Sequence, residues 1–257
     1  MGIGEDLPAV LPISIGADET TLLELTGAYQ VFASGGLQDR PYAVESVVDS
    51  AGHLIYRHED DEKRVINTAV AFLITGALKQ VLRYGTGSTA GRMGIDFPAA
   101  GKTGTTQDYR DGYFIGYTPE LVCGVWVGFD TPQSLGMPGA QAALPAWASF
   151  MSEATSGQAS DFAEPSGIEY ATIDPQSGGL ATSSCPRAIS LPFLVGTAPT
   201  TTCSLHGGMI ACVPPAPMPA STAPAPAMAE PEPSAEPSPA SGNVLGAIGG
   251  FFGRLFH

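Results

Sequence analysis

Proline and alanine dominate the chain after Cys212, and this change in composition limits how much of the sequence can fold. Of the 257 residues, 23 are proline, and many of these fall in the final stretch. A segment of this kind buries too little apolar surface to offset the conformational entropy that it would lose on folding. We therefore expect a folded body of roughly 210 residues, followed by a disordered Pro/Ala-rich linker over residues 213–242.

Apolar side chains return at the end of the sequence, where residues 243–257 form a candidate amphipathic tail. They recur at helical spacing, which would place them on one face: Val244, Leu245, Ile248, Phe251, Phe252, Leu255 and Phe256. The glycines between them weaken any free helix. Two interpretations stay open, a tail that contacts a membrane surface or a partner, and a frayed terminus.

The charge of the chain argues against one large class of partners. Its formal net charge is −14, and its 11 lysines and arginines are scattered, whereas nucleic-acid binding needs clustered basic residues. We expect no nucleic-acid partner. The start, from Met1 to Asp6, lacks the basic region of an export signal, and no run approaches the roughly 18 apolar residues of a membrane span. Taken as written, the sequence predicts a cytoplasmic chain without an export signal or anchor.

The spacing of apolar residues predicts helices and an antiparallel sheet. Thr21-Leu-Leu-Glu24 has the form of a capping box, and Asn67 stands at the start of a second helical repeat. Short apolar runs separated by turns predict strands, and Thr118-Pro-Glu120 is a tight connection between two of them. We expect helices at 20–34, 67–85 and 144–151, a hairpin at 42–48 and 53–57, and strands at 99–105, 113–117 and 121–129. Such separate runs indicate an α+β domain.

Three of the four cysteines lie in a stretch rich in glycine, serine, threonine and proline. Over residues 156–212 we expect an irregular, Cys-containing appendage with little periodicity. One disulfide is plausible there if the compartment is oxidising, and the candidate pair is Cys185 and Cys203. A zinc site is the alternative, but its ligands would have no standard spacing, so we expect no metal. Those ligands would be Cys185, Cys203, His206 and Cys212.

The stretch Ala100-Gly-Lys-Thr-Gly-Thr-Thr106 carries the most chemical information, and two kinds of site contain such a sequence. A phosphate-binding loop requires glycine five positions before Gly101, but Asp96 stands there, and its carboxylate would repel a nucleotide. We expect no cofactor. The other site is the Lys-Thr-Gly strand of the penicillin-recognising serine enzymes. In it a lysine ammonium and hydroxyls bind a carboxylate, and a backbone N–H helps to form an oxyanion hole.

The sequence on both sides of this motif resembles one family. Four segments follow each other in order: Tyr84-Gly-Thr-Gly87, the run from Phe97 to Asp111, Phe114-Ile-Gly-Tyr-Thr-Pro119 and Val125-Trp-Val-Gly-Phe-Asp130. The series resembles the C-terminal part of the transpeptidase domain of class A (bifunctional) penicillin-binding proteins. The resemblance covers about residues 15–155, and residues 168–206 more loosely. It implies a partial serine β-lactamase/penicillin-binding-protein transpeptidase fold over residues 1–155, an antiparallel sheet with flanking helices.

Carried over to this sequence, the resemblance implies a binding strand. Lys102, Thr103, Gly104 and Thr105 would bind the carboxylate of a peptidoglycan stem peptide or of a β-lactam, and the Thr105 N–H would complete the oxyanion hole. The alternative for each is a structural residue of an edge strand. The implied reaction is D,D-transpeptidation, the cross-linking of peptidoglycan in the cell wall through an acyl-enzyme, which β-lactams intercept.

The serine nucleophile of that family is missing from this sequence. The mechanism needs a serine three residues before a lysine, so that both lie on one helix face. The three lysines are preceded at that distance by Asp60, Gly76 and Ala99. The family's Ser-x-Asn motif occurs only at Ser241-Gly-Asn243, after the linker. Ser88 and Cys123 have no lysine or histidine nearby in sequence to act as a base, so we expect no catalytic residue and no activity of this chain alone.

Three functional hypotheses remain open. In the first, the chain is a fragment of a periplasmic transpeptidase whose N-terminal helix anchors it to the inner membrane. In the second, it is one half of a split transpeptidase and works in trans with the missing upstream part of the same enzyme. In the third, it is a non-catalytic interaction module of the cell envelope, and residues 243–257 contact a membrane or a partner.

Overall fold

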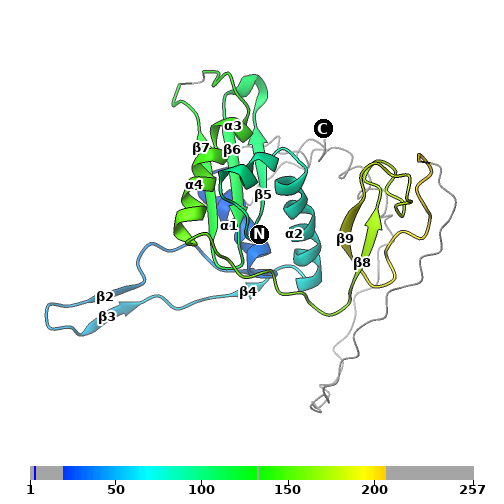
Figure 1. Ribbon diagram of the computed structural model, residues 1–257. Coiled ribbons are helices and arrows are strands. Elements are labelled where there is room, and N and C mark those ends of the chain that lie inside the picture. Colours follow the sequence, from blue (N-terminus) through cyan, green and yellow to red (C-terminus); the bar gives the residue numbers. More distant parts are fainter. Residues whose placement is uncertain (1–2, 4–19, 132, 207–257) are drawn as a thin grey trace, which may run out of the picture.

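An antiparallel sheet of three strands forms the centre of the protein (Figure 1). The structure, a computed structural model, describes residue 3, residues 20–131 and residues 133–206. The linker expected at 213–242, the tail expected at 243–257 and Cys212 lie outside the described residues. Within the described part, no helix is both long and apolar enough to cross a membrane.

The three strands occur where the apolar runs predicted them. They are β5 (Ala100–Thr105), β6 (Gly112–Tyr117) and β7 (Val122–Val127), in the order β5-β6-β7 with antiparallel neighbours. In the register, Lys102 is opposite Ile115, and Ile115 is opposite Gly124. The turn from β6 to β7 is closed by the Thr118 N–H, which donates to the Leu121 carbonyl at 2.9 Å. The tight connection predicted at this point is confirmed.

Helices cover both faces of the sheet, and their starts follow from local capping. Helix α1 (Leu22–Ala33) begins with the predicted capping box, in which Thr21 and Glu24 each accept the other's backbone N–H. Helix α2 (Thr68–Arg83) begins at the predicted cap, Asn67, whose side chain accepts from the Ala69 N–H. Helix α4 (Leu144–Ala154) follows a short helix α3 (Gly139–Ala142).

Two apolar cores hold these layers together. On one face, Phe114 of β6 packs against Trp147 of α4 with ring centroids 4.6 Å apart, and both side chains are fully buried. On the other face, Tyr117 packs against Leu78 and Val81 of α2. Gly116 permits the close approach of α4, because a Cβ there would lie 2.5 Å from the Trp147 ring.

The predicted hairpin near the N-terminus extends away from the body (Figure 1). It consists of β2 (Ser46–Val48) and β3 (Leu54–Arg57), and every residue in both strands is exposed. At its base, the two-residue strands β1 (Leu37–Gln38) and β4 (Lys63–Arg64) pair with each other. The hairpin therefore contributes apolar side chains to the surface rather than to the core.

The appendage contains more regular structure than the sequence predicted. Strands β8 (Ile168–Ile173) and β9 (Ile189–Leu194) form an antiparallel hairpin, so the expectation of a wholly irregular segment was wrong. Ile173, Ile189 and Leu191 bury their side chains in a small cluster of their own. Figure 1 shows α2 between this hairpin and the sheet, and a Cβ on Gly76 of α2 would lie 2.6 Å from Pro192 of β9.

Candidate functional site

The Lys-Thr-Gly-Thr sequence occupies the second half of β5, at the edge of the sheet. Lys102, Thr103 and Gly104 are half-buried, and Thr105 is exposed. Because side chains alternate along a strand, Lys102 lies on the opposite face from Thr103 and Thr105. On its outer side β5 pairs with no strand among the described residues. This edge therefore offers backbone donors and acceptors to a ligand.

The ammonium of Lys102 is poorly solvated and has no anionic partner among the residues that the structure describes. Its Nζ donates to the Thr103 carbonyl oxygen at 3.0 Å, and no carboxylate among the described residues forms an ion pair with it. Burial lowers the pKa of Lys102 below its ordinary value. A cation that has lost part of its hydration gains the most from an anion placed beside it. Lys102 thus favours an anionic ligand at the end of β5.

The two threonines of the motif are held from outside the strand. The hydroxyl of Thr103 lies 2.7 Å from the Thr86 hydroxyl, and the Gly139 N–H donates to the Thr105 hydroxyl at 3.0 Å. Thr86 belongs to the Tyr84-Gly-Thr-Gly87 segment, which the fold brings beside β5. No role for Thr86 was predicted from the sequence, although a threonine between two glycines was a local signal of a site.

The turn that ends β5 is fixed by hydrogen bonds around Asp111. Its carboxylate accepts from the Thr106 hydroxyl and from the Trp126 indole N–H, both at 3.0 Å. Its backbone N–H donates to the Thr106 hydroxyl at 2.8 Å. Asp108 and Tyr109 within the turn have positive φ angles of 59° and 54°. The end of the motif strand is thereby anchored to β6 and β7.

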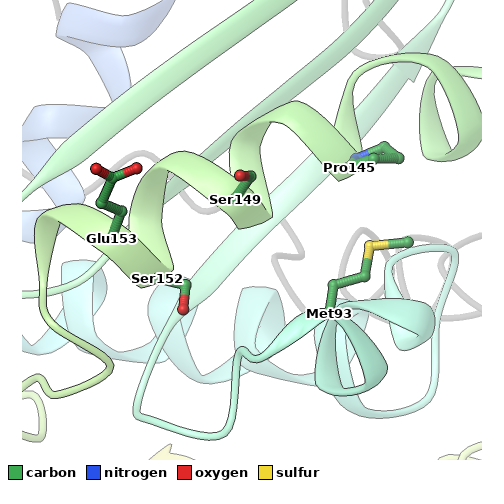
Figure 2. Close-up of a pocket in the computed structure, with 5 residues that line it drawn as sticks. All are labelled: Met93, Pro145, Ser149, Ser152 and Glu153. Carbon is green, nitrogen blue, oxygen red and sulfur yellow. The ribbon is translucent and has the colours of Figure 1, made fainter.

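An open pocket lies between α4 and the 3₁₀ helix η2 (Ser88–Met93), and it is separate from the motif (Figure 2). Its volume is about 400 Å³, and none of its lining residues belongs to β5. Two serines of α4 line it, but no described lysine or histidine hydrogen-bonds to either. The lining side chains are Met93, Pro145, Ser149, Ser152 and Glu153.

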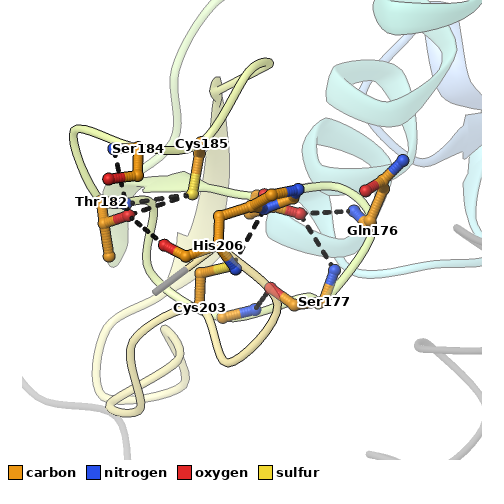
Figure 3. A network of polar contacts seen from close by, with 9 residues as sticks. Gln176, Ser177, Thr182, Ser184, Cys185, Cys203 and His206 are labelled. Carbon is orange, nitrogen blue, oxygen red and sulfur yellow. Dashed lines mark hydrogen bonds and ion pairs between the residues drawn. The ribbon is translucent and has the colours of Figure 1, made fainter. Parts of the chain in front are cut away.

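A second polar cluster lies in the appendage (Figure 3). It joins Asp174, Cys185, Cys203 and His206, whose ligand-type atoms all lie within 4.8 Å of one another. Both cysteines are present as free thiols, and the sequence-based disulfide between them stays a prediction. Asp174 was not among the residues predicted from the sequence, because an aspartate at the end of a strand carries no local signal of which residues lie beside it in the fold.

Comparison with known proteins matches both parts of the chain to one family. A model described as the penicillin binding protein transpeptidase domain matches residues 8–148, and one described as the penicillin-binding protein 1A C-terminal domain matches residues 164–208. Penicillin-binding protein 1A from Aquifex aeolicus is 34% identical over 203 residues, which cover 78% of this chain and 28% of that protein. The counterpart from Rickettsia conorii is 34% identical, with 69% and 25% covered. The chain therefore spans about a quarter of the length of these curated relatives.

Solved structures show the same similarity. Penicillin-binding protein 1A from Haemophilus influenzae aligns with a TM-score of 0.67 and 27% identity, covering 76% of this chain and 35% of that one. The PonA1 protein of Mycobacterium tuberculosis in complex with penicillin V aligns with a TM-score of 0.52 and 27% identity, covering 63% and 45%. The α+β fold expected from the sequence, part of a transpeptidase fold, is confirmed.

Proposed function

This chain belongs to the penicillin-binding protein transpeptidase family, and from this premise we propose that β5 binds the substrate carboxylate of a peptidoglycan D,D-transpeptidase. The ligand is the carboxylate of a stem peptide, or that of a β-lactam in its place. Cross-linking of the wall would place the site in the periplasm, as the resemblance implies. The observation that carries the proposal is the position of Lys102 on an edge strand, half-buried and without an anionic partner in the described part of the chain.

The residues around Lys102 support recognition of a carboxylate by a peptide strand. The Thr103 and Thr105 hydroxyls share one face of β5 and can donate to carboxylate oxygens. Thr105 can do so while its oxygen accepts the Gly139 N–H, and Thr103 can do so while it accepts from the Thr86 hydroxyl. Gly104 lacks a side chain, so a substrate backbone can approach the strand closely. The Thr105 N–H would stabilise the oxyanion that forms when the substrate carbonyl is attacked.

The serine nucleophile of the transpeptidase must come from a polypeptide segment outside this sequence. No serine stands three residues before a lysine in this sequence. Cys123 lies half-buried in β7, where burial raises the pKa of its thiol and so disfavours the nucleophilic thiolate. We therefore propose that this chain supplies the carboxylate-binding half of the site, and that a segment with Ser-x-x-Lys supplies acyl transfer.

Labelling by a fluorescent penicillin tests this division of roles. The chain is purified alone, and it is also produced together with the family segment that carries Ser-x-x-Lys, encoded upstream in frame or on a separate chain. We expect covalent labelling only in the second preparation, with mass spectrometry locating the adduct on the serine of the added segment. A stable adduct on a serine of this chain alone would contradict the proposal.

A matched pair of lysine variants tests the role of β5 within the labelled preparation. Lys102→Ala removes the proposed carboxylate partner, whereas Lys63→Ala removes an exposed ammonium from β4. A charge-assisted hydrogen bond contributes about 1.5–3 kcal/mol, so we expect Lys102→Ala to label about 10- to 100-fold more slowly. Equal labelling rates in both variants would show that Lys102 does not bind the carboxylate.

A further inference from the structure

Four side chains of the types that bind Zn²⁺ in proteins, two thiols, an imidazole and a carboxylate, converge in the appendage. His206 Nδ1 lies 2.6 Å from Asp174 Oδ2 and 3.3 Å from Cys203 Sγ, and Cys185 Sγ completes a group within 4.8 Å. Figure 3 shows the two thiols and the imidazole directed toward one another, Cys185 from one loop and Cys203 and His206 from another. Asp174 follows β8, Cys185 lies in the loop before β9, and the other two lie after β9.

The backbone around the cluster is cross-linked by hydrogen bonds. Leu180 N–H donates to the Thr201 carbonyl and Cys203 N–H donates to the Leu180 carbonyl, both at 2.8 Å. The Thr182 hydroxyl donates to the His206 carbonyl at 3.2 Å. These bonds connect the loop before β9 to the segment after it. The four side chains are therefore brought together by the hairpin and its loops, and not by chance proximity of free loops.

Asp174 has a buried carboxylate oxygen that still lacks a regular hydrogen bond. Its side chain is only 1% exposed. Oδ1 accepts from the Gln176 and Ser177 N–H groups at 2.8 and 3.0 Å, whereas Oδ2 has no hydrogen bond of regular geometry and faces His206. A buried anionic oxygen is costly unless a cation lies beside it, so Oδ2 depends on the His206 ring 2.6 Å away or on a metal ion between the two.

Both sulfurs are held in place by backbone hydrogen bonds. The His206 N–H donates to Cys203 Sγ at 3.4 Å. The Thr182 N–H donates to Cys185 Sγ at 3.2 Å. The two thiols are therefore positioned by the same loops that bring the four side chains together.

We propose that Asp174, Cys185, Cys203 and His206 bind one Zn²⁺ ion that holds the appendage together. Two sulfurs, one imidazole nitrogen and one carboxylate oxygen form a closed set of four, as in structural zinc sites. In a tetrahedral site neighbouring ligand atoms lie about 3.3–3.8 Å apart, which the 3.3 Å between His206 and Cys203 matches. Asp174 and His206 lie closer than this and would separate as the ion enters.

The chemistry of the ligands selects zinc over the common alternatives. Two thiolates are poor ligands for Ca²⁺ and Mg²⁺, which prefer oxygen. Zn²⁺ would displace the Cys185 proton, and that of Cys203 where it is still protonated, to the solvent. His206 binds through Nδ1 and keeps its proton on Nε2. No electron transfer occurs, so no oxidant or reductant is required.

A disulfide between Cys185 and Cys203 is the competing outcome, and it was the pairing considered from the sequence. A disulfide would account for two of the four side chains. It would not explain why Asp174 and His206 lie beside the two sulfurs. Only two residues separate Cys203 from His206, a short spacing like that between the paired ligands of many zinc sites. The zinc site does not depend on the proposed function of β5, and either can fail alone.

Metal analysis of the full 257-residue chain tests the proposal. The protein is purified with a reductant, stripped with a chelator and titrated with Zn²⁺ and, separately, with Co²⁺. We expect one equivalent of Zn²⁺ by mass spectrometry of the metal, and a Co²⁺ complex with thiolate charge-transfer bands and the visible bands of tetrahedral coordination. The loss of the Asp174 carboxylate in Asp174→Asn should weaken affinity at least about tenfold.

Cysteine variants provide the matched comparison. Cys185→Ser and Cys203→Ser should lose stoichiometric zinc, whereas Cys123→Ser, which removes a thiol on β7 outside the cluster, should keep it. If either cluster variant fails to fold, the Co²⁺ spectrum of the unsubstituted chain tests the metal site by itself. The absence of thiolate bands would overturn the proposal, as would a Cys185–Cys203 disulfide that forms despite saturating Zn²⁺.

Discussion

The end of β5 and the cluster in the appendage are both rich in polar side chains, but they differ in what completes them. Lys102 on β5 has no anionic partner among the described residues, and the strand edge beside it is unpaired. In the appendage, four ligand-type atoms face inward on each other within 4.8 Å. In our proposal the first arrangement is one side of a site that needs a ligand and further polypeptide, whereas the ligand atoms of the second all come from the appendage itself.

Because of this difference, substitutions in the two regions should have different effects. Changes at β5 should alter ligand binding and have little effect on stability, because Thr105 is exposed and Lys102 is half-buried. Changes in the cluster should alter the stability of the appendage, because Asp174 and Cys203 are buried. The helices packed on the sheet form a third case, in which the loss of apolar contacts should lower the free energy of unfolding.

Trp147→Ala should have the largest effect and should separate the body from the appendage. Removing this fully buried ring from the core around Phe114 should cost about 3–5 kcal/mol of unfolding free energy. Chemical denaturation followed by circular dichroism measures the loss. The control is Trp126→Ala, which removes an exposed indole from β7 and should cost far less. Loss of stoichiometric zinc binding by folded Trp147→Ala protein would show that the two regions are not separate.

Lys102→Ala should have the opposite profile, with a large effect on ligand binding and a small one on stability. The variant should label with penicillin about 10- to 100-fold more slowly in the complemented preparation, because a charge-assisted bond is lost. Its denaturation midpoint should stay close to that of Lys63→Ala, since the ammonium makes no ion pair with a described residue. A marked loss of stability would instead indicate a structural role for Lys102.

The metal-free appendage should be stable only within a limited pH range. Burial raises the pKa of Asp174, but hydrogen bonds from Ser177 and Gln176 and contacts with both thiols lower it to about 2. Its stabilising contribution is therefore present above about pH 4 and is lost as pH falls toward 2. Contacts with Cys203 and Asp174 raise the pKa of His206, so its contribution is present below about pH 6.5 and is lost at higher pH.

Hydrogen exchange of the Gln176 and Ser177 amides measures this pH dependence, because both donate to Asp174 Oδ1. Protection should fall at acid pH in the unsubstituted chain. In Asp174→Asn the amide oxygen can still accept these bonds but does not titrate in this range, so the acid response should flatten. An unchanged acid response in the variant would assign it to other groups.

Thr21→Ala should produce the smallest effect. The substitution removes the hydroxyl that accepts the Glu24 N–H at the start of α1, and the expected cost is about 1 kcal/mol of unfolding free energy. Thermal unfolding followed by circular dichroism measures it. Thr20→Ala is the matched comparison, because its hydroxyl donates to the Glu24 carboxylate at 3.2 Å but accepts no backbone N–H of α1, so its cost should be smaller. Neither variant should change penicillin labelling or zinc binding.

Local signals in the sequence were sufficient to predict the body. The capping box at Thr21, the cap at Asn67 and the turn at Thr118 each depend on residues within a few positions of one another, and all three were confirmed. The Lys-Thr-Gly-Thr motif could be recognised for the same reason, since Lys102 to Thr105 are consecutive, and its binding role stays a prediction. Thr86 could not, because only the fold brings it next to Thr103.

The appendage could not be predicted in the same way, because its order depends on contacts between distant residues. The hairpin pairs Ile173 with Ile189 across a long loop rather than a recognisable tight turn. Cys203 and His206 are near each other in sequence, but Asp174 and Cys185 reach them only when β8 and β9 pair. The sequence indicated the ligand types and gave no basis for placing Asp174 among them.

The most direct test of the central proposal is to locate the penicillin adduct by mass spectrometry in the chain alone and in the chain supplied with a Ser-x-x-Lys segment. We expect no adduct on the chain alone, an adduct on the added serine in the complemented preparation, and slow labelling when Lys102 is replaced by alanine. An adduct on a serine of this chain, or labelling of the complemented preparation that does not depend on Lys102, would contradict the assignment of β5 as the carboxylate-binding strand.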